Sequence, residues 1–344
     1  MDTKTAKFII WLILCLFPAG VVFGAAADHP AQVPDKEVPN VIIISMSGVR
    51  NSESIADPTR QYFPHLFNEM LKEGTLYTDV ICVEQQFHMT TFTSINLGKS
   101  SLLFYKIDRP TIFQYARKKY DWPANKCWMV GNWQGIKGYY EGEGFGEETY
   151  PDEISLGLGV SDALKAVLSP PEQEILDALR ESQKDFAGFN FCNWDAFDTL
   201  AFGLFKKVLK TYHPKLIHYS CDGPDAAHYE SFARYGLTLR QADEIIYYLW
   251  NFIQTDPFYK DNTYLFVNPD DERNAYFRFH DSNARDNPSH VWLYVFGPGV
   301  EKGRVIKRPI HHIDIFPTVA RIMEIEIPPS QGELLTEVFS SAAE

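Results

Sequence analysis

The sequence lacks clustered cations, and this absence excludes one class of partner. Its 32 lysine and arginine residues stand against 45 aspartate and glutamate residues, so the formal net charge is -13. Proteins that bind nucleic acids neutralise phosphates with grouped lysine and arginine side chains. We therefore expect no nucleic-acid partner, and an acidic chain repels an anionic substrate unless a metal ion offsets the charge.

The sequence also lacks a C-x-x-C pair, so a redox motif or a zinc ribbon has no support. Beyond the N-terminal segment the cysteines are Cys82, Cys127, Cys192 and Cys221. Cys82 and Cys127 fall in predicted buried strands. At these positions a buried free thiol and a disulfide both remain open.

The apolar run of residues 8–22 is too short for a membrane span, which needs about 20 apolar residues. Lys4 and Lys7 precede this run, and small residues with an A-x-A spacing follow it. The pattern predicts a secretory signal peptide over residues 1–27, with a retained anchor as the alternative. We expect a periplasmic or secreted protein that keeps no stable membrane anchor after cleavage.

A polar linker over residues 28–39 leads into one domain, residues 40–344. Apolar blocks typical of buried strands occur at residues 41–44, 76–83, 127–131, 216–220, 264–267 and 291–296. Helical periodicity occurs between them, at residues 63–72, 111–119, 171–184, 196–212 and 229–254. This alternation predicts a three-layer α/β/α sandwich with a largely parallel central sheet, whose ligands bind beyond the carboxyl ends of the strands.

The order of several segments resembles the superfamily of alkaline phosphatases, sulfatases and phosphodiesterases. These segments are the strand and turn of residues 40–50, residues 63–75, the G-P-G-V of residues 297–300, and residues 312–318. The resemblance covers nearly all of the chain beyond the leader. It implies an alkaline-phosphatase-like fold and a site at which two divalent metals, usually zinc, flank a nucleophile.

The resemblance also indicates a degenerate member, because demanding positions have changed. Ser47 stands where the family has a metal-binding aspartate, and a neutral hydroxyl is a poor substitute for an anionic ligand. His88 stands at the position of the nucleophile, ten residues before Gly98, and an inactive leftover side chain is the favoured interpretation. Thr90 is a fallback nucleophile if the loop shifts.

The remaining metal positions match the family to different degrees. Asp270 is retained after the apolar run of residues 264–267, whereas Asp271 replaces a histidine, which is a tolerable exchange at a metal. Asp270 and Asp271 are candidate ligands of magnesium or calcium, and an acidic surface turn explains the pair almost as well. Asp225, His228 and His280 resemble the ligands of the other metal, the usual set for a zinc with one open position. The sequence thus predicts at most one zinc, with the second metal absent.

These observations lead to two hypotheses. The favoured one is a non-hydrolytic relative that binds a small ligand, one metal or an envelope protein partner. The alternative is an active phosphate or sulfate ester hydrolase that uses a single zinc or a rearranged nucleophile. A structural partner in an envelope complex is compatible with the first hypothesis.

Overall fold

The computed structural model describes residues 38–82, 88–99, 109–131, 155–156, 162–175, 177, 194–228, 230–277 and 290–339. Contacts divide the chain into two units, residues 1–32 and residues 33–344, and every described residue belongs to the second. The predicted signal peptide lies outside the described residues. No helix in the described part of the chain is long and apolar enough to span a bilayer.

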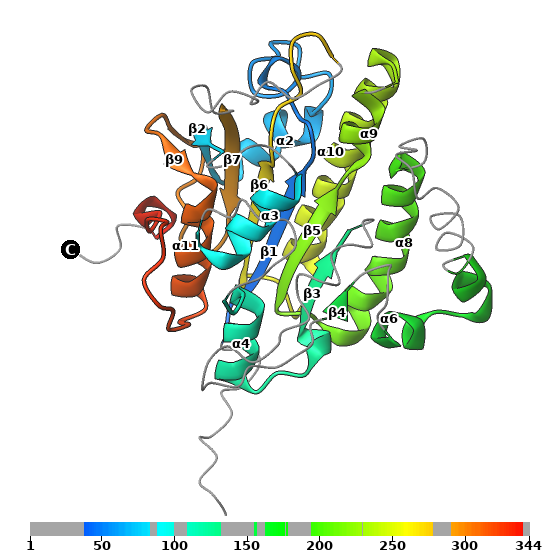
Figure 1. Cartoon of the computed structure of the whole chain (residues 1–344), viewed down its shortest axis with the longest axis vertical. Helices are drawn as coiled ribbons and strands as arrows, with labels where there is room; N and C mark the ends of the chain where they lie inside the picture. Colours follow the sequence, from blue (N-terminus) through cyan, green and yellow to red (C-terminus); the bar gives the residue numbers. More distant parts are fainter. Residues whose placement is uncertain are drawn as a thin grey trace, which may run out of the picture. The chain divides into compact units, whose positions relative to one another are not determined.

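Nine strands form one mixed, mostly parallel sheet in the described part of the chain (Figure 1). Eight follow one path in the order β4 (Ser155–Leu156), β3 (Cys127–Val130), β5 (Leu216–Cys221), β1 (Asn40–Met46), β6 (Thr263–Pro269), β7 (His290–Phe296), β2 (Thr75–Ile81) and β8 (Arg304–Ile306), and β9 (Ile310–His311) also pairs with β2. Only β7 runs antiparallel to its neighbours in this sheet. The largely parallel sheet predicted from the sequence is confirmed.

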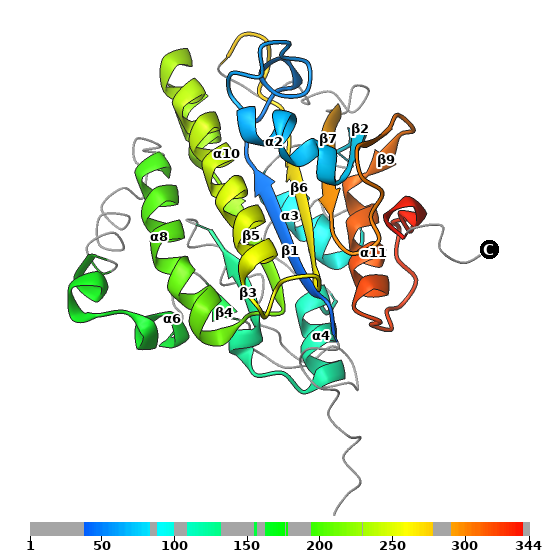
Figure 2. The ribbon, with the colours of Figure 1, turned by 180° about the vertical axis from the view of Figure 1, so that it is seen from behind.

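Helices cover both faces of the sheet, as the two opposite views show (Figures 1 and 2). One face carries α2 (Pro64–Asn68), α6 (Asp162–Val167), α8 (Trp194–Tyr212), α9 (Gly223–His228) and α10 (Phe232–Thr255). The other carries α3 (His88–Leu97), α4 (Ile112–Tyr120) and α11 (Ile315–Ile322). The three-layer sandwich is therefore confirmed.

Strand β1 explains why two cores form. Val41 and Ile43 pack into one hydrophobic cluster, whereas Ile42, Ile44 and Met46 pack into the other. Successive side chains of a strand point to opposite faces, so a continuous apolar run is buried by helices on both sides.

Some helices differ from the predicted ranges. The helical pattern of residues 63–72 divides into α2 and the 3-10 helix η2 (Met70–Glu73). The long helix α10 begins at Phe232 rather than at residue 229, because the Ser231 hydroxyl accepts a hydrogen bond from the Arg234 amide and caps the helix there. Periodicity did not indicate α3, because its described side chains are buried all round and leave no polar stripe.

The described cysteines are free thiols. Cys82, Cys127 and Cys221 are buried and form no disulfide, and Cys192 lies outside the described residues. The buried thiol is therefore the correct alternative for Cys82 and Cys127.

Candidate functional site

The candidate site lies at the carboxyl ends of three adjacent strands, β1, β5 and β6. Met46 at the end of β1 pairs with Cys221 of β5 and with Pro269 of β6. The residues that follow these ends, Ser47, Asp222 and Asp270, are consequently brought together although they are far apart in sequence. Such ends are where parallel α/β sheets bind ligands.

A serine hydroxyl lies between two carboxylates at this place. The Ser47 Oγ atom is 3.3 Å from Asp222 Oδ1 and 3.0 Å from Asp270 Oδ2. A hydroxyl carries one proton and donates it to one of the two at a time. The Ser220 hydroxyl donates a second hydrogen bond to Asp222.

The backbone of the turns adds amide donors to the same carboxylates. The Gly48 amide donates to Asp270 Oδ1 at 3.2 Å and to Asp271 Oδ1 at 3.1 Å. The Asp271 amide donates to Asp270 Oδ1 at 2.7 Å. Gly48 has a φ of 68°, which only glycine adopts without strain, and this conformation allows its amide to face both side chains. The carboxylates are therefore directed at hydroxyl and amide donors.

Helix α3 begins beside these carboxylates. The Thr91 hydroxyl donates to the Asp270 carbonyl at 3.2 Å, and the Cys82 thiol contacts the same carbonyl at 3.3 Å. His88 is the first residue of α3 and Thr90 lies in its first turn, although their side chains lie outside the described part. The backbone of the predicted nucleophile position is thus next to the site.

A buried polar chain lies beneath the site, under α3. The Ser45 hydroxyl is 2.9 Å from His218 Nε2, and His218 Nδ1 is 3.1 Å from Asn96 Oδ1. The Phe92 ring stacks on the imidazole at 4.1 Å. This order of hydroxyl, imidazole and amide is also that of an activated nucleophile. Ser45 and His218 are fully buried, so they are not accessible to a substrate. Their hydrogen bonds, together with that of Asn96, fix α3 to the sheet.

An ion pair that we call the clamp, Arg273 with Glu53, joins the turns after β6 and β1. Arg273 Nη2 is 2.7 Å from Glu53 Oε2, and both side chains are at least nine-tenths buried. The guanidinium also lies 4.9 Å from the ring centres of Tyr235 and Phe277 and 5.8 Å from that of Phe232. Three aromatic rings and one carboxylate therefore surround this cation.

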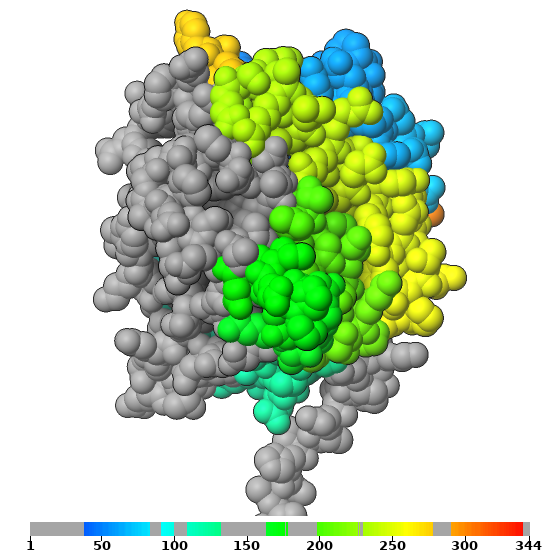
Figure 3. Space-filling model, turned by 90° about the vertical axis from the view of Figure 1, so that its right-hand side faces the viewer, coloured from blue at the N-terminus to red at the C-terminus, as the bar shows by residue number. Residues whose placement is uncertain are grey.

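Further hydrogen bonds connect the same turns. The Tyr235 hydroxyl donates to the Gly48 carbonyl at 2.9 Å, and Arg50 Nη1 donates to the Arg273 carbonyl at 3.1 Å. In the space-filling view the blue residues after β1 lie against the yellow-green start of α10, which carries Tyr235 (Figure 3). The clamp and these hydrogen bonds thus hold together the turn after β1 and the turn after β6.

The carboxylates make the surroundings of the site electronegative. Burial and then the charges of Asp271 and Asp270 raise the pKa of the Cys82 thiol well above its usual range. Burial and then Asp198 and Asp222 do the same to the pKa of Cys221. Both shifts favour the protonated thiol over the thiolate that a nucleophilic cysteine requires.

Among the described residues, no group of three or more His, Cys, Asp or Glu side chains is arranged to hold a metal ion. Ser47, Asp270 and Asp271 do come together as predicted, but they bind hydroxyl and amide donors.

The residues of the predicted zinc site are only partly described. Asp225 lies half-buried in the first turn of α9, and His228 ends that helix with its side chain outside the described part. His280 lies outside the described residues. The zinc site formed by these three residues remains a prediction.

Sequence reasoning missed Asp222. It directly follows the apolar strand β5 just as Asp270 follows β6, and that position was the available signal. Asp225 was predicted instead, because with His228 it resembles the family's pair of aspartate and histidine at the start of a long helix. Arg273 and Glu53 carried no signal, because 219 positions separate them and neither belongs to a motif.

His312 gives a pH-dependent test of this region. Its Nε2 atom is 2.9 Å from the Pro269 carbonyl, and burial lowers the pKa of the imidazole to about 4. The unfolded state binds this proton more tightly, since its pKa is about 6.5. The contribution of His312 to stability is therefore lost as the pH falls from about 6.5 to about 4.

Between pH 7.5 and pH 4, the free energy of unfolding should fall by about 3 kcal/mol more in the wild type than in His312→Gln. Urea unfolding of both proteins at the two pH values measures this difference. Asp243, whose pKa is raised to about 6 by burial, affects both proteins equally. Parallel pH profiles of wild type and variant would contradict the assignment.

No family model matches the chain, and no curated protein matches its sequence. Solved structures match it by shape. The wild-type alkaline phosphatase PafA is similar with a TM-score of 0.62 and 12% identity, over 88% of this chain and 99% of that one. The chain has the alkaline phosphatase fold.

Two further structures share this alkaline phosphatase fold. A protein in the alkaline phosphatase superfamily from Vibrio parahaemolyticus has a TM-score of 0.57 and 13% identity, over 92% of this chain and 74% of that one. The phosphonate monoester hydrolase SpPMH from Silicibacter pomeroyi has a TM-score of 0.56 and 14% identity, over 89% and 78%. The fold expected from the sequence resemblance is therefore confirmed.

Proposed function

We propose that this chain is an exported, non-hydrolytic protein of the alkaline phosphatase fold that binds a small ligand or a protein partner at its strand ends. The observation that carries the proposal is the Ser47 hydroxyl between Asp222 and Asp270. A two-metal hydrolase needs an anionic ligand there to hold the cation that activates its nucleophile. A neutral hydroxyl supplies no such charge.

The metal content follows from the same argument. The proposal includes at most one zinc, bound by Asp225, His228 and His280, since that set keeps its carboxylate and imidazoles. Asp270 and Asp271 serve in this proposal to organise the turn. Export is proposed from the leader over residues 1–27.

We expect the purified protein to show no turnover of aryl phosphates, aryl phosphodiesters or aryl sulfates with zinc, magnesium or manganese. A nucleophile and its metal act as a unit, so the loss of either removes most of the rate. Chromogenic assays test this, with metal content measured on the same preparation by mass spectrometry. The Thr90→Ala and His88→Ala variants serve as matched controls.

Hydrolysis that disappears in Thr90→Ala or His88→Ala would show that the site is rearranged and active, as in the alternative hypothesis. Two tightly bound metals per chain would also contradict the proposal. Activity that persists in both variants but disappears in His228→Ala would indicate the single-zinc hydrolase of the alternative hypothesis and would also contradict the proposal. Activity that persists in all three variants would come from a contaminant.

A further inference from the structure

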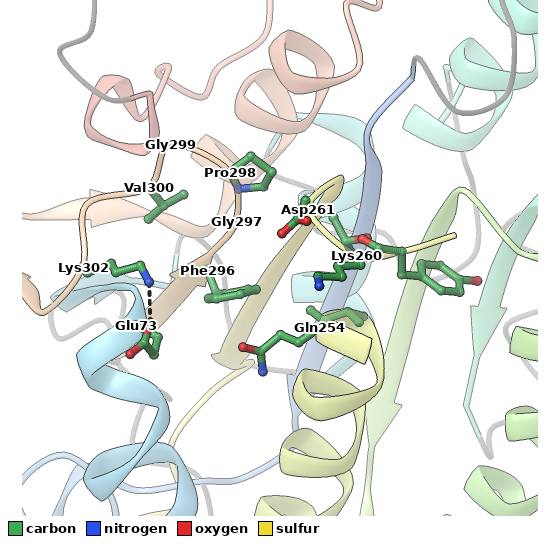
Figure 4. A pocket seen from close by; sticks show the side chains of 13 residues that line it. Glu73, Gln254, Lys260, Asp261, Phe296, Gly297, Pro298, Gly299, Val300 and Lys302 are labelled. Atoms are coloured by element: carbon green, nitrogen blue, oxygen red, sulfur yellow. Dashed lines mark hydrogen bonds and ion pairs between the residues drawn. The ribbon is translucent and has the colours of Figure 1, made fainter. Parts of the chain in front are cut away.

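A pocket lies at the end of the sheet opposite to the candidate site, where β6 begins and β7 ends. It has a volume of 360 Å³, within the range of about 300–1,000 Å³ that is typical of small-molecule sites. The end of α10, the turn before β6 and the turn after β7 form its walls (Figure 4). Because β7 is antiparallel, its last residues reach the edge at which β6 begins. The pocket is therefore separate from Ser47 and Asp270.

One part of the pocket wall is apolar, and polar and charged side chains form the rest. Ile253, Tyr259 and Val300 line the apolar part and are buried, and the partly exposed ring of Phe296 stands at its centre in the close view (Figure 4). Such a surface favours an apolar group of about the size of a side chain, since removing it from water is favourable.

Four charged side chains lie at the rim: two form an ion pair with each other, and the other two, which we call the couple, do not. Lys302 and Glu73 bind each other at 2.6 Å. Lys260 and Asp261 are adjacent in the chain and exposed, and within the described residues neither side chain has an ion-pair or hydrogen-bond partner. One ammonium and one carboxylate are consequently available to a ligand.

The turn that carries this couple is fixed by its backbone. The Lys260 amide donates to the Asp256 carbonyl at 2.9 Å, and the Asn262 amide donates to the Tyr259 carbonyl at 3.2 Å. Asp261 has a φ of 60° in the left-handed region, which a non-glycine residue adopts only in a well-defined turn. The backbone positions of Lys260 and Asp261 are therefore fixed at the rim of the pocket, and only their side chains are ordered on binding.

We propose that this pocket binds a free α-amino acid with an apolar side chain. The ligand carboxylate pairs with Lys260, its ammonium pairs with Asp261, and its side chain packs against Phe296 and Val300. Gln254 extends toward the same space and offers an amide that donates or accepts (Figure 4). A zwitterion matches the two opposite charges, and its zero net charge avoids repulsion by a chain of net charge -13.

Isothermal titration calorimetry of the purified full chain tests the proposal with three probes: leucine, leucinamide and N-acetylleucine. Leucinamide lacks the carboxylate and N-acetylleucine lacks the ammonium. We expect leucine to bind about tenfold more tightly than either analogue, because each analogue loses one charge-assisted contact.

Two variants assign the contacts. Lys260→Gln should remove the preference for leucine over leucinamide, and Asp261→Asn should remove the preference over N-acetylleucine. Lys307, which is exposed and does not line the pocket, provides the matched control, and Lys307→Gln should keep both preferences. Circular dichroism confirms that each exposed-site variant is folded.

Absence of leucine binding would overturn the proposal, and so would preferences that persist unchanged in both pocket variants. Equal binding of leucine and N-acetylleucine by the wild type would show that the ligand is a simple anion, which also overturns it. None of these results bears on Ser47 or on hydrolysis, so the two proposals fail independently.

Discussion

Replacing Ser47 by aspartate is expected to lower the free energy of unfolding by about 4 kcal/mol in metal-free buffer. The new carboxylate would stand beside Asp222 and Asp270 at the place of a fully buried hydroxyl. Two like charges about 4 Å apart repel by about 4 kcal/mol at an effective dielectric constant of about 20. Urea denaturation with a chelator present measures the loss.

Magnesium or zinc should restore stability to the Ser47→Asp variant, because a cation that binds only the folded state stabilises it. The wild type should show no such dependence at this place. Ser47→Asn is the matched control, since it has nearly the shape of aspartate without its charge. Magnesium gives the decisive comparison, because the proposed zinc ligands include two imidazoles, which favour zinc. A wild type that gains as much stability from magnesium as the variant would show that Asp222 and Asp270 already bind a metal, contrary to the proposed function.

Replacing Arg273 by methionine is expected to lower the free energy of unfolding by about 3–5 kcal/mol. The substitution leaves the carboxylate of Glu53 buried without its partner, which is the costly way to break a buried ion pair. It also removes the cation from three aromatic rings. Chemical denaturation monitored by tryptophan fluorescence measures the change.

Two further variants separate charge from packing in this clamp. The double change Arg273→Met with Glu53→Met should recover part of the lost stability, because no unpaired charge remains. Arg304→Met breaks an exposed pair with Glu301 and should cost less than about 1 kcal/mol. Equal losses in Arg273→Met and Arg304→Met would refute a special role for the clamp.

The sequence predicted the sheet well because its strands are buried on both faces. Runs such as residues 41–44 and 291–296 need no knowledge of their partners to be recognised. Helix α3 escaped notice for the opposite reason: a helix surrounded by protein shows no polar stripe. The direction of β7 also escaped, since an apolar run is the same in either orientation.

The candidate site was predictable only where a residue follows a strand or fits a motif. Ser47, Asp270 and Asp271 were found in this way, and the structure brings them together with Asp222. The clamp could not be predicted, because Glu53 and Arg273 belong to no motif and come into contact only through tertiary packing. The proposed zinc ligands remain predictions from sequence.

The position of β1 in the sheet has a consequence for the order of folding. This first strand lies between β5 and β6, which begin at residues 216 and 263. Its backbone hydrogen bonds cannot form until more than half of the chain has been synthesised, and such distant pairings slow folding. The nascent chain therefore carries the apolar strand β1 unpaired while residues 47–215 are synthesised and depends on protection from aggregation during that time. Late pairing of β1 is also compatible with the proposed export.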